Sequence, residues 1–418
     1  MRVVRGRVFY RGRLESLDLG IESGRFASIK KNVESRETID YGERIILPGA
    51  IDLHVHMREP GLTEKEDFPS GTRCAALGGV TTVVDMPNTI PAVSTADALS
   101  AKRKILQGRS SVDYGLFGAP RISTAVPDLA AADAFKAYMA PSTGDLAVGE
   151  DALSGVIREV GAQGKILAVH AEDPRWFKRA SARGLEGHSV SRPIESEVHA
   201  IETVATNRGH TAIHIAHVTC VAALDAVPSG MSTEVTPHHL FLDFLSPSGG
   251  LGKVNPPLRS PGDRRALWDA FRGGRIDLVA SDHAPHTHDE KTSGPFDEIP
   301  SGMPGVATSL PLLLRQVRSQ ELGLDRLVSA LATKPAEMLH LKKGRIEVGY
   351  DADMVVVDPR QVEKITSKRL GYKCGWTAFE GFEGIFPEAV YLRGEPILEE
   401  GETIVEGAGR PIHLDNAS

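Results

Sequence analysis

The two ends of the chain alternate apolar and polar residues in short runs. Residues 1–47 contain "RVVRGRVFY", "RLESLDLGIESG" and "ETIDYGERIILPG", separated by turns that contain glycine. Near the C-terminus, "GRIEVGYDADMVVVD" and "EAVYLRGEPILEEGE" repeat the pattern. A period of two is typical of β-hairpins, because successive side chains of a strand point to opposite faces. Both ends are therefore predicted to be rich in β-strand.

The middle of the chain, from residue 48 to 343, alternates short apolar runs with segments of helix length. The runs that we interpret as strands are "AIDLHVH", "VTTVVDMP", "VDYGLFGA", "AFKAYM", "KILAVHA", "TAIHIAHV", "MSTEVTPH" and "RIDLVASDH". Eight strands that alternate with helices are typical of a (β/α)8 TIM barrel. We expect an α/β fold with this barrel over residues 48–343, and a smaller β-sandwich domain made of residues 1–47 and 344–418.

The composition is that of an ordinary globular protein with a modest negative charge. The chain has 418 residues, of which 41% are hydrophobic and 25% charged, and its formal net charge is -7. This length accommodates a large barrel and a smaller domain. The negative charge argues against nucleic acid or an anionic membrane as a partner. A small anionic substrate would then need a local positive site.

Cysteine use and the N-terminal residues indicate a cytoplasmic protein. Only Cys74, Cys220 and Cys374 are present, which favours reduced, structural thiols over a disulfide framework. Arginines interrupt every apolar run of "MRVVRGRVFYRGR", so we expect neither a signal peptide nor a transmembrane segment there. No other apolar run is long enough to span a bilayer.

His54 and His56 lie at the end of the first predicted barrel strand, in "IDLHVHMR". Residues two apart share one face of a strand, so both imidazoles project to the same side. A single buried histidine is more often a core residue than a metal ligand. The pair therefore indicates half of a metal site, and the rest of the chain must decide.

Further residues able to bind metal occupy the ends of other predicted strands. In a TIM barrel the C-terminal strand ends meet on one rim, where functional groups gather. Four histidines and one carboxylate suit zinc or a similar divalent ion, and they exceed what one tetrahedral catalytic ion requires. We therefore expect two ions on this rim. The candidate residues are His54, His56, Lys136, His170, His217 and Asp282.

Lys136, in "FKAYM", stands where a pair of ions would need a bridging anion. A protonated lysine has no lone pair for a metal. Its neutral amine, however, reacts with carbon dioxide to give a carbamate, which is an anion with two oxygens. The alternative is an ordinary ammonium that binds an anion in the barrel mouth. The sequence leaves both interpretations open.

Short motifs follow one another in a fixed order: "DLHVHMREPG", "MPNT", "FKAYM", "VHAED", "HIAHVT", "NPPLR" and "SDHAPH". Together they resemble the cyclic amidohydrolases, and most closely the dihydroorotases. The segment "GRIEVGYDADMVVVD" resembles the C-terminal β-segment of that superfamily. Each motif alone is weak, but the ordered set is specific and covers nearly the whole chain.

The resemblance implies a two-metal hydrolase that opens and closes a cyclic amide. It assigns His54, His56 and Asp282 to one ion and His170 and His217 to the other, with carboxylated Lys136 between them. A hydroxide that bridges the ions would attack the ring carbonyl, and Asp282 would pass its proton to the leaving ring nitrogen. In reverse, the same groups would close N-carbamoyl-L-aspartate to L-dihydroorotate, a step of de novo pyrimidine biosynthesis.

Arg58 follows the histidine pair by two residues, and its planar guanidinium suits the carboxylate of such a substrate. The alternative for Arg58 is a surface salt bridge with Glu59 or Glu64. The resemblance adds Asn88 and His286 as further carboxylate partners, and Asn255 as a residue near the ring.

Other features have an accessory or structural interpretation. Residues 287–305, "THDEKTSGPFDEIPSGMPG", form a candidate active-site lid because they are long and rich in Gly, Pro and Ser. His238 and His239 are expected to support the site, since the ligand set is already full. Asp85 either orients a ligand histidine or ends its strand. The residues expected to face solvent are His188, His199 and His210.

Rival functions share most of these features. An allantoinase or a hydantoinase-type enzyme would share the metals, but a substrate without a carboxylate would leave Arg58 unpaired. A non-catalytic assembly subunit would be expected to lack a ligand, and none is missing here. A homodimer and docking on aspartate carbamoyltransferase stay open as associations, beside a small-molecule substrate.

Overall fold

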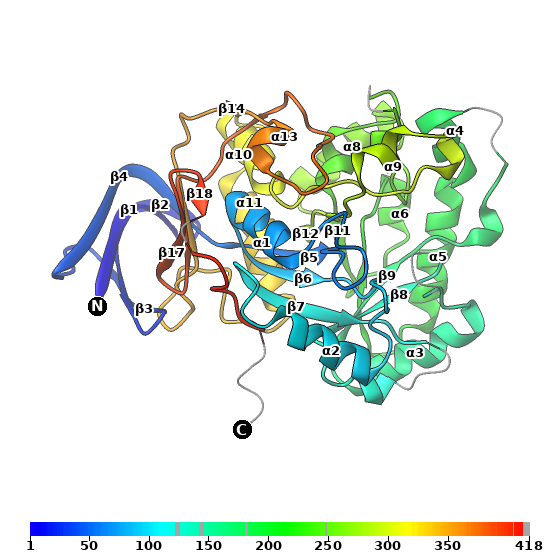
Figure 1. Cartoon of the computed structure of the whole chain (residues 1–418), viewed down its shortest axis with the longest axis horizontal. Coiled ribbons are helices and arrows are strands. Elements are labelled where there is room, and N and C mark those ends of the chain that lie inside the picture. The colour runs from blue at the N-terminus through cyan, green and yellow to red at the C-terminus, as the bar shows by residue number, and fades with distance from the viewer. Residues whose placement is uncertain (122–125, 142–145, 180–182, 247–248, 404, 413–418) are drawn as a thin grey trace.

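In the computed structural model, the larger part of the chain is built around a parallel eight-stranded sheet (Figure 1). The structure describes residues 1–121, 126–141, 146–179, 183–246, 249–403 and 405–412. The strands follow one another around the sheet in chain order: β5 (Ala50–Val55), β6 (Val80–Asp85), β7 (Asp113–Gly118), β8 (Ala134–Tyr138), β9 (Ile166–His170), β10 (Ala212–Ile215), β11 (Ser232–Val235) and β12 (Leu278–Val279). Each lies within a run that the sequence predicted to be a strand.

The first and last strands meet, so the sheet closes into a barrel. Val55 at the end of β5 forms a parallel bridge with His283, and the His56 backbone N–H donates to the His283 carbonyl at 2.7 Å. The strands from β5 to β8 are buried along their whole length. Strands buried on both faces read as continuous apolar runs, which is why the sequence pattern identified them.

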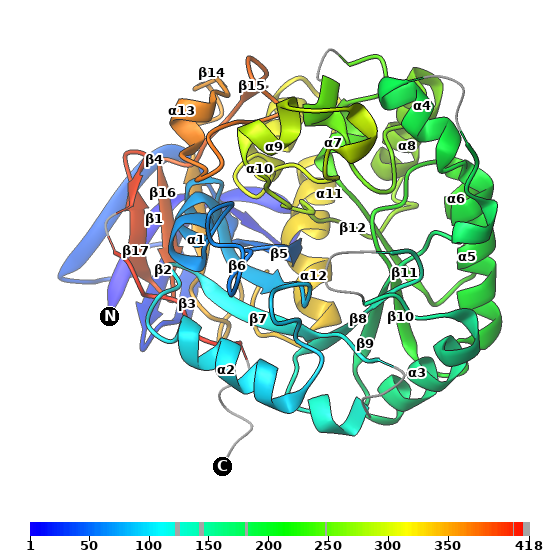
Figure 2. The same ribbon diagram turned by 45° about the vertical axis from the view of Figure 1, so that its right-hand side comes forward.

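Helices surround the barrel, as the turned view in Figure 2 shows for α2, α3, α5 and α6. The α-helices are α1 (Phe68–Leu77), α2 (Ala96–Leu106), α3 (Glu150–Ala162), α4 (Gly184–Ser191), α5 (Ile194–Asn207), α6 (Val221–Asp225), α7 (Pro237–Phe241), α8 (Pro261–Arg272), α9 (His288–Thr292), α10 (Ser309–Arg318), α11 (Leu324–Val328), α12 (Lys334–Met338) and α13 (Ser367–Leu370). Short helical turns are η1 (Val126–Leu129), η2 (Pro174–Trp176), η3 (Gly249–Gly252), η4 (Phe296–Glu298) and the π-helical turn η5 (Ser329–Thr333).

One connection departs from the regular alternation. Between β7 and β8 the described residues contain only η1, not a helix of full length. The α/β barrel class is nevertheless confirmed. None of the helices in the described ranges combines the length and the apolar character needed to cross a membrane.

The two chain ends meet in a second sheet beside the barrel, at the left of Figure 1. Its order is β18-β17-β16-β13-β4-β1-β2-β3, so four C-terminal strands and four N-terminal strands form the two halves of one hydrogen-bonded sheet, joined where β13 pairs with β4. Their bounds are β1 (Arg2–Tyr10), β2 (Arg13–Glu22), β3 (Arg25–Lys30), β4 (Glu37–Pro48), β13 (Met354–Val357), β16 (Ala389–Leu392), β17 (Glu395–Glu399) and β18 (Glu402–Thr403). The smaller domain that the sequence predicted is thus built from the expected segments.

The C-terminal segment also reaches back to the barrel. Its two-stranded sheet, β14 (Glu363–Lys364) and β15 (Glu383–Gly384), lies beside α10. There the Ile385 N–H donates to the Pro311 carbonyl at 3.1 Å. The Trp376 indole donates to the His286 carbonyl at 2.7 Å. We propose domain boundaries at residues 47/48 and 343/344, with residues 1–47 and 344–418 as the two parts of the smaller domain.

Candidate metal centre and binding cavity

A cavity of about 370 Å³ lies at the C-terminal ends of the barrel strands. Its lining contains every residue that the sequence analysis singled out for metal or substrate. The predicted residues that line it are His54, His56, Arg58, Asn88, Lys136, His170, His217, Asn255, Asp282 and His286. The structure therefore brings together residues that are up to 232 positions apart in the sequence, from His54 to His286.

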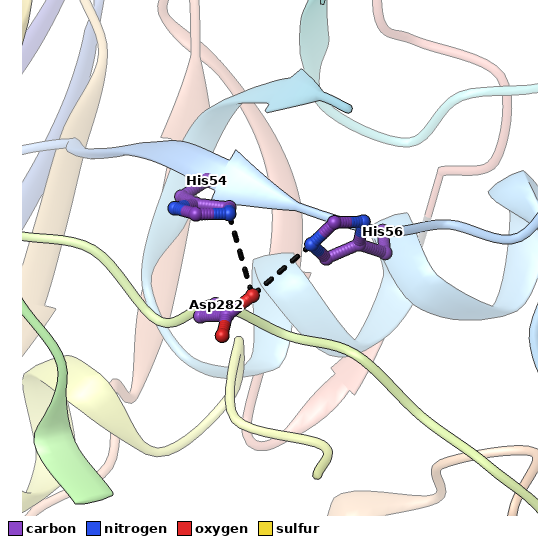
Figure 3. Close-up of side chains that lie close together, drawn as sticks. All are labelled: His54, His56 and Asp282. Carbon is purple, nitrogen blue, oxygen red and sulfur yellow. Dashed lines mark hydrogen bonds and ion pairs between the residues drawn. The ribbon is translucent and has the colours of Figure 1, made fainter. Parts of the chain in front are cut away.

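His54, His56 and Asp282 converge on one point of this cavity (Figure 3). Asp282 Oδ1 lies 3.0 Å from His56 Nε2 and 3.4 Å from His54 Nε2. One ligand atom from each residue falls within 4.8 Å of the others, and all three residues are buried. Two imidazoles and a carboxylate at this separation form a donor set that suits zinc or a similar divalent ion.

Buried acceptors fix the tautomers of the histidine pair. His54 Nδ1 donates to Glu234 Oε1 at 2.5 Å, and His56 Nδ1 donates to Asn88 Oδ1 at 2.6 Å. Because a carboxylate or amide oxygen can only accept, the proton sits on Nδ1 in both rings. Each Nε2, which lies nearest Asp282, is then the ring nitrogen available to a metal. Metal-binding histidines are oriented in this way by an acceptor behind the ring.

His170 and His217 form a second pair on the neighbouring strands. His170 Nδ1 lies 3.0 Å from His217 Nε2, while His170 Nε2 donates to Glu172 Oε2 at 2.7 Å. Glu172 is itself held by Arg192 at 2.6 Å. Burial opposes the charge on Glu172, but Arg192 and His170 outweigh it and lower the pKa of Glu172 well below its ordinary value. An ionised Glu172 keeps the His170 lone pair on Nδ1, which faces His217.

Lys136 lies in the middle of β8 with its amine fully enclosed. The side chain is 1% exposed, and Nζ has no hydrogen-bond partner among the described residues. Burial lowers the pKa of Lys136 to about 8. An unpartnered ammonium in a buried site is costly, and the lowered pKa increases the fraction of neutral amine, which is the form that reacts with carbon dioxide. The surroundings of Lys136 therefore fit the carbamate interpretation.

Arg58 is buried inside the cavity wall and is not a surface residue. It is 3% exposed, its Nε donates to the Pro285 carbonyl at 3.0 Å, and one terminal nitrogen lies 3.2 Å from His286 Nε2. Within the described part of the chain it forms no ion pair with a carboxylate. Glu59, one of its predicted surface partners, pairs with Arg109 instead. Arg58 thus brings a buried positive charge to the cavity without a protein anion to match it.

His286 lies between two positively charged side chains, Arg58 and Lys65, at this side of the cavity. Lys65 Nζ lies 3.2 Å from His286 Nδ1 and 2.7 Å from Glu290 Oε1. Burial, followed by the charges of Arg58 and Lys65, lowers the pKa of His286 far below its ordinary value. His286 is therefore neutral at physiological pH, and its ring acts as a hydrogen-bonding group beside Arg58.

Asn255 is oriented by His188, for which the prediction from sequence was wrong. His188 was expected to face solvent, but its Nε2 lies 2.9 Å from Asn255 Oδ1 and 3.0 Å from the Val254 carbonyl. Burial lowers the pKa of His188 to about 4. The expectation failed because the loop that carries Asn255 packs on α4, which periodicity within α4 does not reveal.

The remaining histidines behave as supporting or surface residues. His239 is buried and contacts Thr236 Oγ1 at 2.7 Å and the Pro256 carbonyl at 3.1 Å. His210 is exposed, and His199 contacts Asp173 at 2.7 Å with 36% of its side chain exposed. Asp85 touches no ligand histidine; it accepts from the Met57 N–H at 2.7 Å and pairs with buried Lys102.

Three predicted site residues adopt left-handed backbone conformations. The φ angles are 62° for Arg58, 39° for His217 and 45° for Asp282. Residues with a side chain enter this region at a cost of roughly 1–3 kcal/mol each, and the surrounding structure must hold them there. The strain falls on residues that the cavity needs in defined positions.

The sequence analysis missed the buried groups behind the ligands. Glu234 and Glu172 are 1% and 0% exposed, and each orients a ligand histidine. A glutamate inside a predicted barrel strand, and a glutamate two residues after a candidate ligand histidine, were the available signals. Tyr138 also lines the cavity, and its hydroxyl has no partner among the described residues.

The chain is similar to a protein family and to several known proteins. A profile of the Amidohydrolase family matches residues 45–389. The dihydroorotase of Halobacterium salinarum is 39% identical over 99% of this chain and 100% of that protein. The dihydroorotase of Methanosarcina acetivorans is 35% identical over 98% of this chain and 94% of that protein. The structure of L-hydantoinase (dihydropyrimidinase) from Arthrobacter aurescens is similar with a TM-score of 0.93 and 28% identity, over 98% of this chain and 99% of that one.

Proposed function

The chain belongs to the amidohydrolase family, and from this premise we propose that it interconverts N-carbamoyl-L-aspartate and L-dihydroorotate. It is a metal-dependent cyclic amide hydrolase. The observation that carries the substrate assignment is Arg58, a buried guanidinium in the cavity wall with no carboxylate partner in the described chain. A substrate carboxylate supplies the missing anion, because a planar guanidinium binds a carboxylate through paired hydrogen bonds.

The full-length relatives named dihydroorotase support this substrate over the ring of a hydantoinase. The solved structures that resemble the chain are hydantoinases, so the shape of the barrel alone does not separate the two activities. Arg58 favours the dihydroorotase activity over that of a hydantoinase, because hydantoin and dihydrouracil have no carboxylate. Asn88, with its amide N–H groups, and neutral His286 are proposed to complete the carboxylate site.

We propose two zinc ions or similar divalent ions in the cavity. His54, His56 and Asp282 would hold one ion, and His170 and His217 the other, with a carbamate on Lys136 between them. This set fits because one ring nitrogen of His54, His56 and His170 is held by a buried acceptor, and because the Lys136 amine has no partner in the described chain. When bound, such ions supply a water of lowered pKa and polarise the ring carbonyl.

The side chains of the chain have separate roles in ring opening. Asp282 is ionised, since His54 and His56 offset its burial and hold its pKa well below the ordinary value. Its carboxylate takes the proton that the attacking water loses and delivers it to the ring nitrogen as the C–N bond breaks. Arg58, Asn88 and His286 hold the substrate carboxylate, and Asn255 lies near the ring. In ring closure the proton moves the other way.

The decisive experiment combines metal analysis with substrate comparison. The protein is purified without chelator, its metal per chain is measured, and ring opening of L-dihydroorotate, allantoin and dihydrouracil is followed. About two ions per chain with turnover of dihydroorotate alone is expected. Turnover of allantoin or dihydrouracil would instead overturn the carboxylate role of Arg58.

A Lys136→Ala variant tests the bridging carbamate. It is expected to lose metal and activity together, because the ligand set loses its shared anion. A variant with full metal and undiminished turnover would remove Lys136 from the site. Wild-type protein prepared with bicarbonate labelled by carbon-13 provides a direct readout, a carbamate carbon signal that the variant lacks.

Location and assembly are further proposals. We propose a cytoplasmic enzyme, supported by three buried cysteines that are all free thiols. A homodimer and association with aspartate carbamoyltransferase are proposals that light scattering, with and without that enzyme, tests directly.

A further inference from the structure

Two loops form one side of the cavity. The first loop, residues 249–256, begins with η3 and carries Asn255 near its end. The second loop, residues 287–302, contains α9 and η4 and ends at Gly302. Asn255, Pro300, Ser301 and Gly302 all line the cavity. The second loop is most of the segment that the sequence predicted as a lid. How the two loops are joined therefore decides the shape of the substrate site.

Lys253, from the first loop, bonds to the backbone of the second. Its Nζ donates to the Phe296 carbonyl at 2.8 Å and to the Asp297 carbonyl at 3.0 Å. The ammonium also lies 5.1 Å from the centre of the Phe296 ring. Lys253 is 6% exposed, so this contact is part of the interior and not a surface interaction.

Lys291, from the second loop, bonds back to the first. Its Nζ donates to the Lys253 carbonyl at 2.9 Å and to the Pro300 carbonyl at 2.8 Å. The same Lys253 carbonyl accepts the Gly302 N–H at 2.9 Å. Lys291 is fully buried and lies 5.9 Å from the centre of the Trp376 ring. Lys253 thus holds two carbonyls of the second loop, while Lys291 holds one carbonyl of the first loop and one of its own.

Neither lysine forms an ion pair with a carboxylate of the described chain. Burial lowers the pKa of both lysines, that of Lys291 to about 7. Burying two amines costs free energy, and the compensation visible here is four hydrogen bonds to backbone carbonyls. A core that needed only to fill space would use apolar side chains. The presence of two lysines in this core is explained by their hydrogen bonds between the two loops.

The loops also approach so closely that no side chain fits between them. A Cβ on Gly250 would lie 2.2 Å from the Lys291 carbonyl oxygen. At Gly250 the backbone of the first loop therefore packs directly on the second loop, against the Lys291 backbone and the Ile299 side chain. At the cavity end of the same contact, the Ser301 carbonyl lies 3.2 Å from His286 Nε2.

We propose that Lys253 and Lys291 form a reciprocal clamp that holds loops 249–256 and 287–302 together as one wall of the substrate site. Lys291 is a positioning residue: it touches no substrate atom but fixes the loops that carry Asn255 and Ser301. The clamp governs how tightly the ring substrate is held and leaves the metal ligands in place. This inference rests on the proposed function for its substrate readout.

The test uses the purified metal-loaded enzyme and four variants. Lys291→Met and Lys253→Met remove the donors but keep the length and apolar stem of each side chain, and the double variant removes both. Lys104→Met, on the exposed face of α2, is the matched control. The measurements are KM and kcat for L-dihydroorotate, metal per chain, and hydrogen–deuterium exchange of residues 287–302 at one pH.

Lys291→Met is expected to raise KM at least tenfold, to change kcat less than threefold, and to speed exchange of residues 287–302, with metal content unchanged. Because the lysines act as one unit, the double variant is expected to cost less than the sum of the single variants. The control should match the wild type. Lys253→Met provides the same test if Lys291→Met does not fold.

Unchanged KM together with unchanged exchange in either single variant would overturn the clamp. A loss of metal would also overturn it, because it would place the lysines in the support of the metal site. If the wild-type chain opens no dihydroorotate, the proposed function fails, and the exchange measurement alone decides the clamp.

Discussion

Glu234 Oε1 accepts a hydrogen bond of 2.5 Å from His54 Nδ1, and neither side chain is more than 2% exposed. The same oxygen accepts the His217 N–H at 3.2 Å, and the other oxygen lies 3.0 Å from His214 Nε2. One carboxylate beneath the cavity floor therefore orients residues assigned to both ions. Its ionisation is favoured, since His54 and His214 offset its burial and hold its pKa well below the ordinary value.

Replacing Glu234 by Gln is expected to weaken metal binding about 10- to 100-fold, the usual cost of losing a buried partner of a ligand histidine. The amide keeps the size of the side chain but lacks the negative charge that strengthens the hydrogen bond from His54 Nδ1. Metal loss against a graded chelator measures the effect. Glu22→Gln, at the exposed end of β2, is the control, and equal metal retention in both variants would show that Glu234 does not tune the site.

Arg58→Ala is expected to raise KM for L-dihydroorotate by a factor of about 10 to 100, since a hydrogen bond to a charged group contributes roughly 1.5–3 kcal/mol. Metal content should not change, because Arg58 is bonded to Pro285 and His286 and to no ligand. Steady-state kinetics measure the effect, with Arg158→Ala on the exposed face of α3 as control. An unchanged KM would remove Arg58 from the substrate site.

The sequence predicted which residues gather at the cavity, because their positions follow from strand geometry. His54 and His56 share a face by alternation, and His170, His217 and Asp282 end strands whose ends must meet on one rim. No such rule reaches the groups behind them. Glu234 supports His54 across 180 residues of sequence, and this partnership depends on which strands face each other across the barrel interior.

The loops were predicted least well, for a related reason. His188 has the sequence context of an exposed helical residue, yet the loop bearing Asn255 covers it. The segment 287–305 looks like an unrestrained lid because its Gly, Pro and Ser content is visible. The contacts of Lys253 and Lys291 with backbone carbonyls leave no trace in composition, since any residue supplies a carbonyl.

Lys343→Met is expected to lower the free energy of unfolding by about 3–5 kcal/mol, the typical cost of breaking a buried ion pair. Lys343 is 5% exposed and joins the barrel to the second sheet, with Nζ 2.7 Å from Asp113 and 2.6 Å from Asp353. The variant leaves these carboxylates with a buried charge. Urea unfolding measures the change. Lys364→Met, which removes an exposed 3.7 Å pair, should cost less than 1 kcal/mol, and equal midpoints for the two variants would contradict the prediction.

The lysine clamp is expected to make separation of the two loops harder as the pH rises above 7. Burial, then the charges of Lys253 and Arg58, lowers the pKa of Lys291 to about 7, and Glu290 opposes this. When the loops separate, water reaches the amine and its pKa returns toward the ordinary 10.5. The separated form therefore binds more protons between pH 7 and 10.5, so raising the pH favours the joined form.

For each extra proton that the separated form binds, the free energy of loop separation rises by up to about 1.4 kcal/mol per pH unit. A neutral amine still has two N–H donors, enough for both carbonyls, so deprotonation does not dismantle the clamp. Chymotrypsin cleavage after Phe296, divided by cleavage of an unfolded peptide of the same sequence at each pH, measures loop separation. The corrected rate of the wild type should fall more steeply from pH 7 to 9 than that of Lys291→Met, in which only Lys253 titrates nearby. Equal slopes would mean that Lys291 stays buried when the loop is cleaved, and that the clamp does not open as inferred.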